Sequence, residues 1–139
     1  MTTHLRGMLD TSTVILLGRL TDSDALPEES VISAVTLAEL SVGPHVAKTS
    51  TERAARQAHL QQAEADFEPI PFDAAAARAF GLVAASLRSA GRKPTARAYD
   101  ALIAATAIAN DMPLYTCNPG DFASIRGLIV CAIPHPGPG

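Results

Sequence analysis

Four acidic residues have positions in the sequence that would allow their carboxylates to bind a cation together. Asp10 follows a short apolar run, Glu39 lies one turn into a helical segment, and Asp100 opens a nearly continuous apolar helix. Asp121 follows a later short apolar run. Gathered carboxylates repel one another unless a cation is present, and Mg²⁺ prefers oxygen ligands together with waters and a substrate phosphate. The pattern therefore favours a Mg²⁺ site, with Mn²⁺ as the alternative ion.

Each of these positions also has an ordinary structural explanation as part of a helix start. The explanations are an N-cap at Asp10 or Ser12, a capping box from Thr36 to Glu39, a dipole interaction at Asp100, and an N-cap at Asn118 before Pro119. Taken singly, each explanation is at least as good as a catalytic role. They give no reason for Asp100 to precede an almost wholly apolar helix, where its carboxylate is partly desolvated.

The elements that position these residues are short apolar runs alternating with longer helical patterns. We expect strands at 5–9, 30–33, 68–72, 114–117 and 128–133, helices at 13–20, 36–47, 51–65, 73–90 and 99–110, and a loop at 92–98. The prolines in 68–72 predict a poorly paired or edge strand. Gly43 and Pro44 predict that the second helix ends early.

Strands that alternate with helices predict an α/β fold. The expected architecture is a central, mostly parallel sheet with helices on both faces. In such sheets the ligand site lies beyond the carboxyl ends of the strands, at a topological switch point. Because the acidic residues follow strands or open helices, we expect them to meet at this edge of the sheet.

The length of 139 residues fits one domain, which we place at 1–133. Residues 134–139 are rich in proline and glycine, so we expect a disordered tail. No apolar run approaches the roughly 18 residues of a membrane span, and the start of the chain does not read as a signal peptide. Cys117 and Cys131 match no metal-ligand spacing and indicate reduced thiols of a cytoplasmic protein.

Charge and the basic residues bear on the binding of nucleic acid. The formal net charge of −3 argues mildly against nonspecific DNA binding, although it does not exclude an enzyme that grips nucleic acid through metal ions. Arg92, Lys93 and Arg97 form a basic loop shortly before Asp100. This loop is either a solvated connection between helices or a contact surface for RNA phosphates.

Four stretches of the sequence carry a resemblance to a known family. They are Leu9-Asp-Thr-Ser12, Ser33-Ala-Val-Thr-Leu-Ala-Glu-Leu40, Tyr99-Asp-Ala-Leu-Ile-Ala-Ala-Thr-Ala107 and Thr116-Cys-Asn-Pro-Gly-Asp-Phe122. In order and spacing they resemble PIN-domain ribonucleases, and in particular VapC-type toxins of VapBC toxin–antitoxin systems. The resemblance spans nearly the whole chain, and the stretch around Asp100 is its most specific part.

The resemblance implies a PIN-like three-layer α/β/α sandwich and a set of site residues. By position, Asp10, Glu39 and Asp100 correspond to the family's first three acidic metal-site residues. Asp121 is the implied fourth acid, although Asn118 stands where some relatives have Asp. The polar residues expected to surround the acids are Ser12, Thr116 and Asn118.

The function implied is that of a metal-dependent endoribonuclease toxin, neutralised by a cognate VapB-type antitoxin, with a homodimer as the expected assembly. The alternatives are a PIN nuclease that is not a toxin, or a catalytically weak RNA-binding module. A haloacid-dehalogenase-type phosphatase is disfavoured, because Ser12 stands where its second Asp is needed. A receiver domain is disfavoured as well, because its acidic pair and its Lys after the last strand are missing.

Overall fold

Five parallel strands form the central sheet of the computed structural model, which describes residues 5–137. The strands are β1 (Arg6–Leu9), β2 (Glu29–Ser33), β3 (Pro69–Ile70), β4 (Leu114–Thr116) and β5 (Val130–Ala132). They lie in the order β3-β2-β1-β4-β5, so β1 has β2 on one side and β4 on the other. The order reverses at β1, which makes its carboxyl end the switch point of the sheet.

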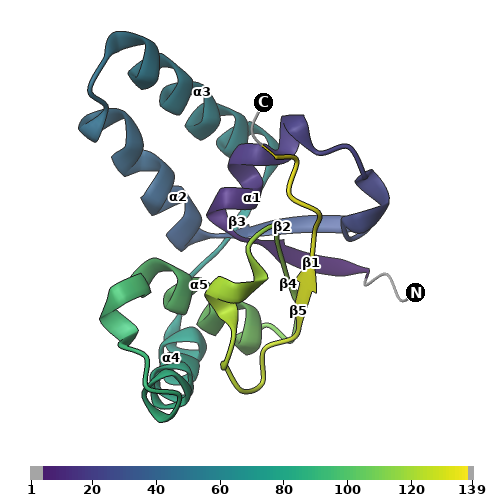
Figure 1. The fold of residues 1–139 in the computed structure, drawn as a ribbon, viewed down its shortest axis with the longest axis vertical. Coiled ribbons are helices and arrows are strands. Elements are labelled where there is room, and N and C mark those ends of the chain that lie inside the picture. The colour runs from purple at the N-terminus through teal and green to yellow at the C-terminus, as the bar shows by residue number, and fades with distance from the viewer. Residues whose placement is uncertain (1–4, 138–139) are drawn as a thin grey trace.

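Five α-helices cover the two faces of the sheet (Figure 1). They are α1 (Thr11–Leu16), α2 (Ala34–Val42), α3 (Ser50–Asp66), α4 (Ala74–Ser89) and α5 (Ala98–Ala109). Short 3₁₀ helices join them: η1 (Leu17–Arg19), η2 (Ser23–Ala25), η3 (Gly43–Val46), η4 (Pro94–Arg97) and η5 (Pro119–Phe122). None of the helices described in residues 5–137 is long and apolar enough to cross a membrane.

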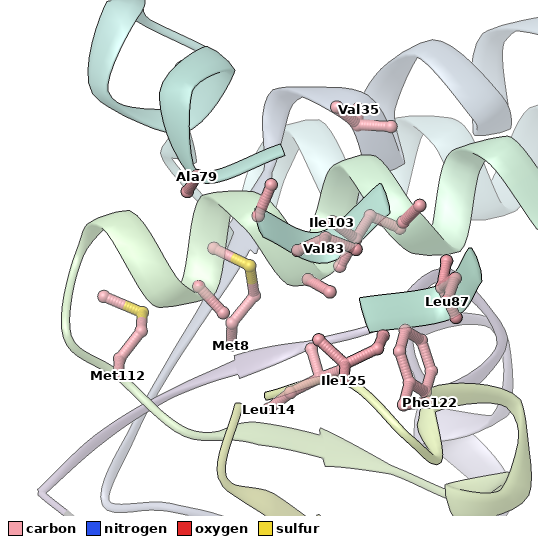
Figure 2. Close-up of a cluster of buried hydrophobic side chains, with 14 of the residues drawn as sticks. Met8, Val35, Ala79, Val83, Leu87, Ile103, Met112, Leu114, Phe122 and Ile125 are labelled. Atoms are coloured by element: carbon pink, nitrogen blue, oxygen red, sulfur yellow. The ribbon is translucent and has the colours of Figure 1, made fainter. Parts of the chain in front are cut away.

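The pleat of the strands divides the apolar residues between two cores. Met8 and Leu114 face α4 and α5, where they pack with Val83, Ile103 and Phe122 (Figure 2). Their neighbours in sequence turn to the opposite face, where Leu9, Ile32 and Tyr115 pack against α1, α2 and α3. Successive side chains of a strand point to opposite faces, so a sheet covered on both sides needs apolar residues in both registers. This is the predicted three-layer α/β/α arrangement.

The predicted elements are all present in the predicted order, but several bounds were wrong. The first helix begins at Thr11 rather than residue 13, because the Asp10 carboxylate caps it. The second begins at Ala34 rather than residue 36, because Ser33 is its N-cap. It ends at Val42, as the Gly-Pro pair predicted, and continues as η3.

Two further segments were also wrong in extent. The strand expected at 68–72 shrinks to Pro69–Ile70 at the edge of the sheet, where a missing proline N–H is tolerated. The loop expected at 92–98 contains η4 and the first residue of α5. Residues 133–137 contain no helix or strand, and residues 138–139 of the predicted tail lie outside the described residues, as do 1–4. The disorder of the tail stays a prediction.

The close approach of β1 and β4 makes one glycine a test of this packing. A Cβ added to Gly7 on β1 would lie 2.5 Å from Cε1 of the Tyr115 ring. Gly7→Ala is therefore expected to lower the free energy of unfolding by about 1–3 kcal/mol, through overpacking. Gly81→Ala, in an open position of α4, is the matched control and should stabilise the protein by up to about 1 kcal/mol. Urea denaturation measures both, and equal effects of the two variants would contradict this packing.

Candidate active site

Asp10 is held rigidly at the carboxyl end of β1. Its side chain is buried, with 3% exposed, and it accepts hydrogen bonds from four donors. Oδ1 accepts from the backbone N–H of Thr13 at 3.2 Å and from the Thr13 hydroxyl. Oδ2 accepts from the hydroxyls of Ser12, at 3.0 Å, and Thr116, at 2.9 Å. Asp10 is thus an N-cap, as its ordinary explanation required, and also the centre of a polar network at the switch point.

Residues at the end of β4 join the hydrogen-bond network around Asp10. Asn118 Nδ2 donates to the Ser12 hydroxyl at 3.0 Å, and the Asn118 backbone N–H donates to the Thr116 hydroxyl at 2.9 Å. The Cys117 backbone N–H donates to the Thr13 hydroxyl at 3.1 Å. The expected neighbours Ser12, Thr116 and Asn118 therefore surround Asp10. The side chain of Asn118 forms no cap hydrogen bond at the start of η5, so the N-cap explanation fails in that respect.

Glu39 is linked to the start of α1 rather than to its own helix start. The Thr11 hydroxyl donates to Glu39 Oε1 at 2.7 Å and lies 3.1 Å from the Thr36 hydroxyl oxygen. A hydroxyl carries a single proton, so when Thr11 donates to Glu39 it accepts from Thr36. The ordinary explanation of Glu39 as part of a capping box with Thr36 is therefore wrong. Thr36 is buried within α2, whose N-cap is Ser33.

Asp100 and Asp121 approach each other from two different elements. Asp100 lies in the first turn of α5, with 23% of its side chain exposed, and Asp121 lies in η5, with 31% exposed. Nη1 of Arg97 lies 3.0 Å from Asp121 Oδ2 and 3.7 Å from Asp100 Oδ2. One guanidinium therefore pairs with both carboxylates.

The four acids share one electrostatic environment. Burial, followed by repulsion from Asp121, Glu39 and Asp10, raises the pKa of Asp100 to about 6, and this value includes the lowering effect of Arg97. Burial also raises the pKa of Glu39, where the Thr11 hydrogen bond opposes the shift and the charge of Asp10 adds to it. The raised pKa of Asp100 indicates that burial and the neighbouring acids favour its protonated form in mildly acidic solution when no cation compensates the charges.

The donor chemistry of these residues suits a hard divalent cation. All four acids supply carboxylate oxygens, and their mutual repulsion falls when a cation is bound. Within residues 5–137, however, no three His, Cys, Asp or Glu side chains are arranged to hold a metal ion as they stand. Mg²⁺ is commonly held by one or two carboxylates plus waters and substrate phosphate, so it does not need such a closed cage.

Two pockets open next to these acids. Asp100 and Asp121 line a pocket of about 260 Å³ together with the basic residues Arg92, Lys93 and Arg97. Glu39 and Thr11 line a second pocket of about 230 Å³. Asp10 lines neither, although its charge raises the pKa of both Glu39 and Asp100. The predicted acids thus lie in three adjacent places. Asp100 and Asp121 line the first pocket, Glu39 lines the second, and Asp10 is buried between α1 and β4.

The basic loop lies at the mouth of the first pocket. Nη1 of Arg92 donates to the backbone carbonyl of Ala123 at 2.7 Å, which fixes its position beside the pocket. Arg97 pairs with the acids, as described above. The structure thus brings Arg92, Lys93 and Arg97 to the same opening, and their contact with RNA stays a prediction.

Sequence reasoning missed the hydroxyl donors that orient the acids. Thr11, Thr13 and Thr36 are buried and bind the acids or one another. A signal was present, because the run Asp10-Thr-Ser-Thr13 has a hydroxyl at every position after the acid. In a helix start, consecutive hydroxyls point in different directions, so one run supplies donors to both Asp10 and Glu39.

Comparisons with known proteins agree with this fold. The family model of the PIN domain matches residues 8–128. Ribonuclease VapC5 of Mycobacterium tuberculosis is 39% identical over 91% of this chain and 92% of its own length. Ribonuclease VapC of Rickettsia bellii is 28% identical over 91% of this chain and 96% of its own length.

Among solved structures, the VapBC-5 toxin–antitoxin system of Mycobacterium tuberculosis contains a similar chain. The two superpose with a TM-score of 0.79 and 33% identity, over 93% of this chain and 99% of that chain. The match to the PIN domain covers all four acids, and the relatives match at nearly full length. The chain therefore belongs to the PIN-domain family and, within it, to the VapC ribonucleases.

Proposed function

We propose that this chain is a metal-dependent endoribonuclease that acts as the toxin of a toxin–antitoxin pair. The proposal is supported by the proximity of Asp10, Glu39 and Asp121 to Asp100, close enough for each of their charges to raise its pKa, in a chain with the PIN-domain sheet. The family relationship supports the same activity, because the matching relatives are ribonucleases.

The proposed metal ligands are the four acids, with Mg²⁺ as the expected ion and Mn²⁺ as the alternative. When bound, the ion supplies activation of a water molecule and charge neutralisation on the phosphodiester. Asp10 presents its carboxylate in a fixed orientation because four donors hold it. Glu39 is oriented by Thr11.

Asp121 is favoured over Asn118 as the fourth residue of the site. Asp121 lines the same pocket as Asp100 and bears a negative charge that attracts a cation. The amide of Asn118 donates to Ser12, which places it in the hydrogen-bond network behind Asp10. We assign Ser12, Thr116 and Asn118 the role of orienting Asp10.

Arg92, Lys93 and Arg97 are the proposed contacts to the RNA phosphates. They border the pocket that holds Asp100 and Asp121, so an RNA strand that enters it passes a cationic rim. This local charge offsets the acidic net charge of the chain. The proposed location, given an RNA substrate, is the cytoplasm.

The proposed partner is a VapB-type antitoxin, as in the VapBC complexes of the structural neighbours. A groove of about 620 Å³ runs between α1, η1 and α3. Its lining combines apolar residues, such as Ile15, Leu17 and Phe67, with the polar residues Arg19, His59, Gln62 and Asp66. Ile15 and His59 also border the pocket of Glu39, so the groove leads toward the acids. An amphipathic helix of the partner suits this groove. The homodimer expected from the sequence stays a proposal.

Replacement of Asp10 by Asn tests the proposed function directly. Asp10→Asn keeps the shape and the N-cap but removes the charge, so RNA cleavage should fall by at least about 100-fold. Asp73→Asn is the matched control, because Asp73 caps α4 in the same way, away from the acids. Cleavage is measured with added Mg²⁺ and with EDTA. Undiminished cleavage by the Asp10 variant would contradict the proposal.

Expression of the chain without a partner separates a toxin from the alternative functions. The unaltered chain should arrest growth, and the Asp10→Asn variant and co-expression with the cognate antitoxin should both permit it. Normal growth with folded, RNA-cleaving protein would indicate a PIN nuclease that is not a toxin. Normal growth without cleavage would leave the RNA-binding alternative.

The two acids of the first pocket should not contribute equally. Asp100 is anchored in α5, whereas Asp121 lies in a short 3₁₀ helix and is more exposed. Asp100→Asn is therefore expected to lower kcat/KM on the order of tenfold more than Asp121→Asn. Steady-state kinetics on one oligoribonucleotide measures both variants. The reverse order would mean that Asp121 is the principal ligand of the pair.

The raised pKa of Asp100 predicts a dependence of stability on pH in the absence of metal. The folded protein binds this proton more tightly than the unfolded chain, so its stability falls as the pH rises from about 4 to about 6. Asp100→Asn removes this loss and should stabilise the metal-free protein at pH 7 by roughly 1–2 kcal/mol, allowing for solvent screening.

Thermal unfolding at several pH values checks this effect. The gain in Tm of Asp100→Asn should increase from pH 4 to pH 7, and added Mg²⁺ should stabilise the unaltered chain more than the variant. A gain that does not change with pH would show that the carboxylate is not the cause.

A further inference from the structure

Arg97 occupies a position between two acids of the proposed metal site. It is the last residue of η4, directly before α5, and its side chain is 56% exposed. Its Nη1 approaches Oδ2 of Asp121, at 3.0 Å, and Oδ2 of Asp100, at 3.7 Å. A single cationic group therefore offsets part of the negative charge of the two carboxylates that line the pocket.

The other acids of the site have a different kind of partner. Asp10 and Glu39 accept hydrogen bonds from hydroxyl groups and backbone, which carry no charge. Among the residues that the structure describes, Arg97 alone forms an ion pair with any of the four acids. Its guanidinium and a metal ion are thus alternatives for the same two oxygen atoms.

The ion pairs of Arg97 are weak enough for a metal ion to replace the guanidinium. Ion pairs of a half-exposed arginine are weak, because water competes for both partners. The side chain is long, and more than half of it faces solvent, so it has room to leave the carboxylates while the backbone of η4 stays in place. Arg92, in the same pocket, instead donates to the carbonyl of Ala123 and forms no ion pair with an acid among residues 5–137.

We propose that Arg97 is a built-in counter-ion, which partly offsets the charge of Asp100 and Asp121 in the metal-free protein, releases them when they bind a metal ion, and then contacts a substrate phosphate. The inference rests on the proposed function. Since the same guanidinium serves first the acids and then the RNA, metal and RNA each favour the binding of the other through Arg97. Such coupling is reciprocal.

Metal affinity of the full chain is the first test. Mn²⁺ binding is measured by electron paramagnetic resonance for the unaltered chain and for Arg97→Gln, Arg97→Lys and Arg92→Gln. Arg97→Gln should tighten Mn²⁺ binding about threefold to tenfold, because the competing charge is gone. Arg92→Gln removes the same charge from the same pocket and should have less than half of that effect. Arg97→Lys should lie between Arg97→Gln and the unaltered chain.

RNA binding is the second test. Anisotropy of a fluorescent phosphorothioate oligoribonucleotide is measured with and without Mn²⁺. Mn²⁺ should strengthen binding to the unaltered chain, and Arg97→Gln should lose at least half of this gain. An equal gain in both proteins would overturn the contact between Arg97 and the phosphate.

The outcomes separate this inference from the proposed function. Equal Mn²⁺ affinities of the unaltered chain and Arg97→Gln, or weaker binding by the variant, would overturn the counter-ion and leave the metal site intact. Equal tightening by Arg97→Gln and Arg92→Gln would overturn it as well, since a general charge effect would suffice. If Arg97→Gln were the one protein of this set that binds Mn²⁺, the result would support the counter-ion role of Arg97. Absence of Mn²⁺ binding in every protein would overturn both the inference and the proposed function.

Discussion

The burial of acidic side chains within reach of one another's charges is the constraint on which the rest of this site depends. Burial and the three neighbouring charges raise the pKa of Asp100 to about 6, so the acids are costly to bring together in the absence of a cation. A fold accepts such a cost only where surrounding groups compensate it. The arrangement of strands, helix starts and hydroxyls around the acids is that compensation.

Each acid is compensated in its own way. Asp10 is buried most deeply and has four hydrogen-bond donors, including the start of α1. Glu39 has the hydroxyl of Thr11, and Asp100 and Asp121 have the charge of Arg97. The two outer acids are therefore held by a group that is able to move, whereas the two inner ones are held by groups fixed in the fold. This difference suits a site whose outer part exchanges ligands during a catalytic cycle.

Much of this organisation follows from local rules in the sequence. Apolar runs in both registers of a strand predict a covered parallel sheet, and the apolar helix after Asp100 predicts a buried α5, as observed. The acids were found because they follow strands or open helices, and the order of a parallel sheet brings such positions together. The first residues of helices were harder to predict, because other polar residues near Asp10 and Ser33 are equally suitable as N-caps.

The contacts between elements could not be read from the sequence. Thr36 and Glu39 have capping-box spacing, yet Glu39 binds Thr11, which lies 28 residues away. Arg97 was identified as a cation near the site, but its pairs with Asp100 and Asp121 depend on where η5 lies relative to α5. Such pairs depend on tertiary packing, which local propensity does not contain.

The central claim is that these four carboxylates form one cation site. Crystals of the protein grown with Mn²⁺, measured at a wavelength that gives manganese anomalous scattering, test it most directly. The account predicts one or more anomalous peaks in contact with oxygen atoms of at least two of the acids Asp10, Glu39, Asp100 and Asp121. A fully occupied manganese elsewhere on the chain, with Arg97 still paired to Asp100 and Asp121 and no peak among the acids, would contradict it.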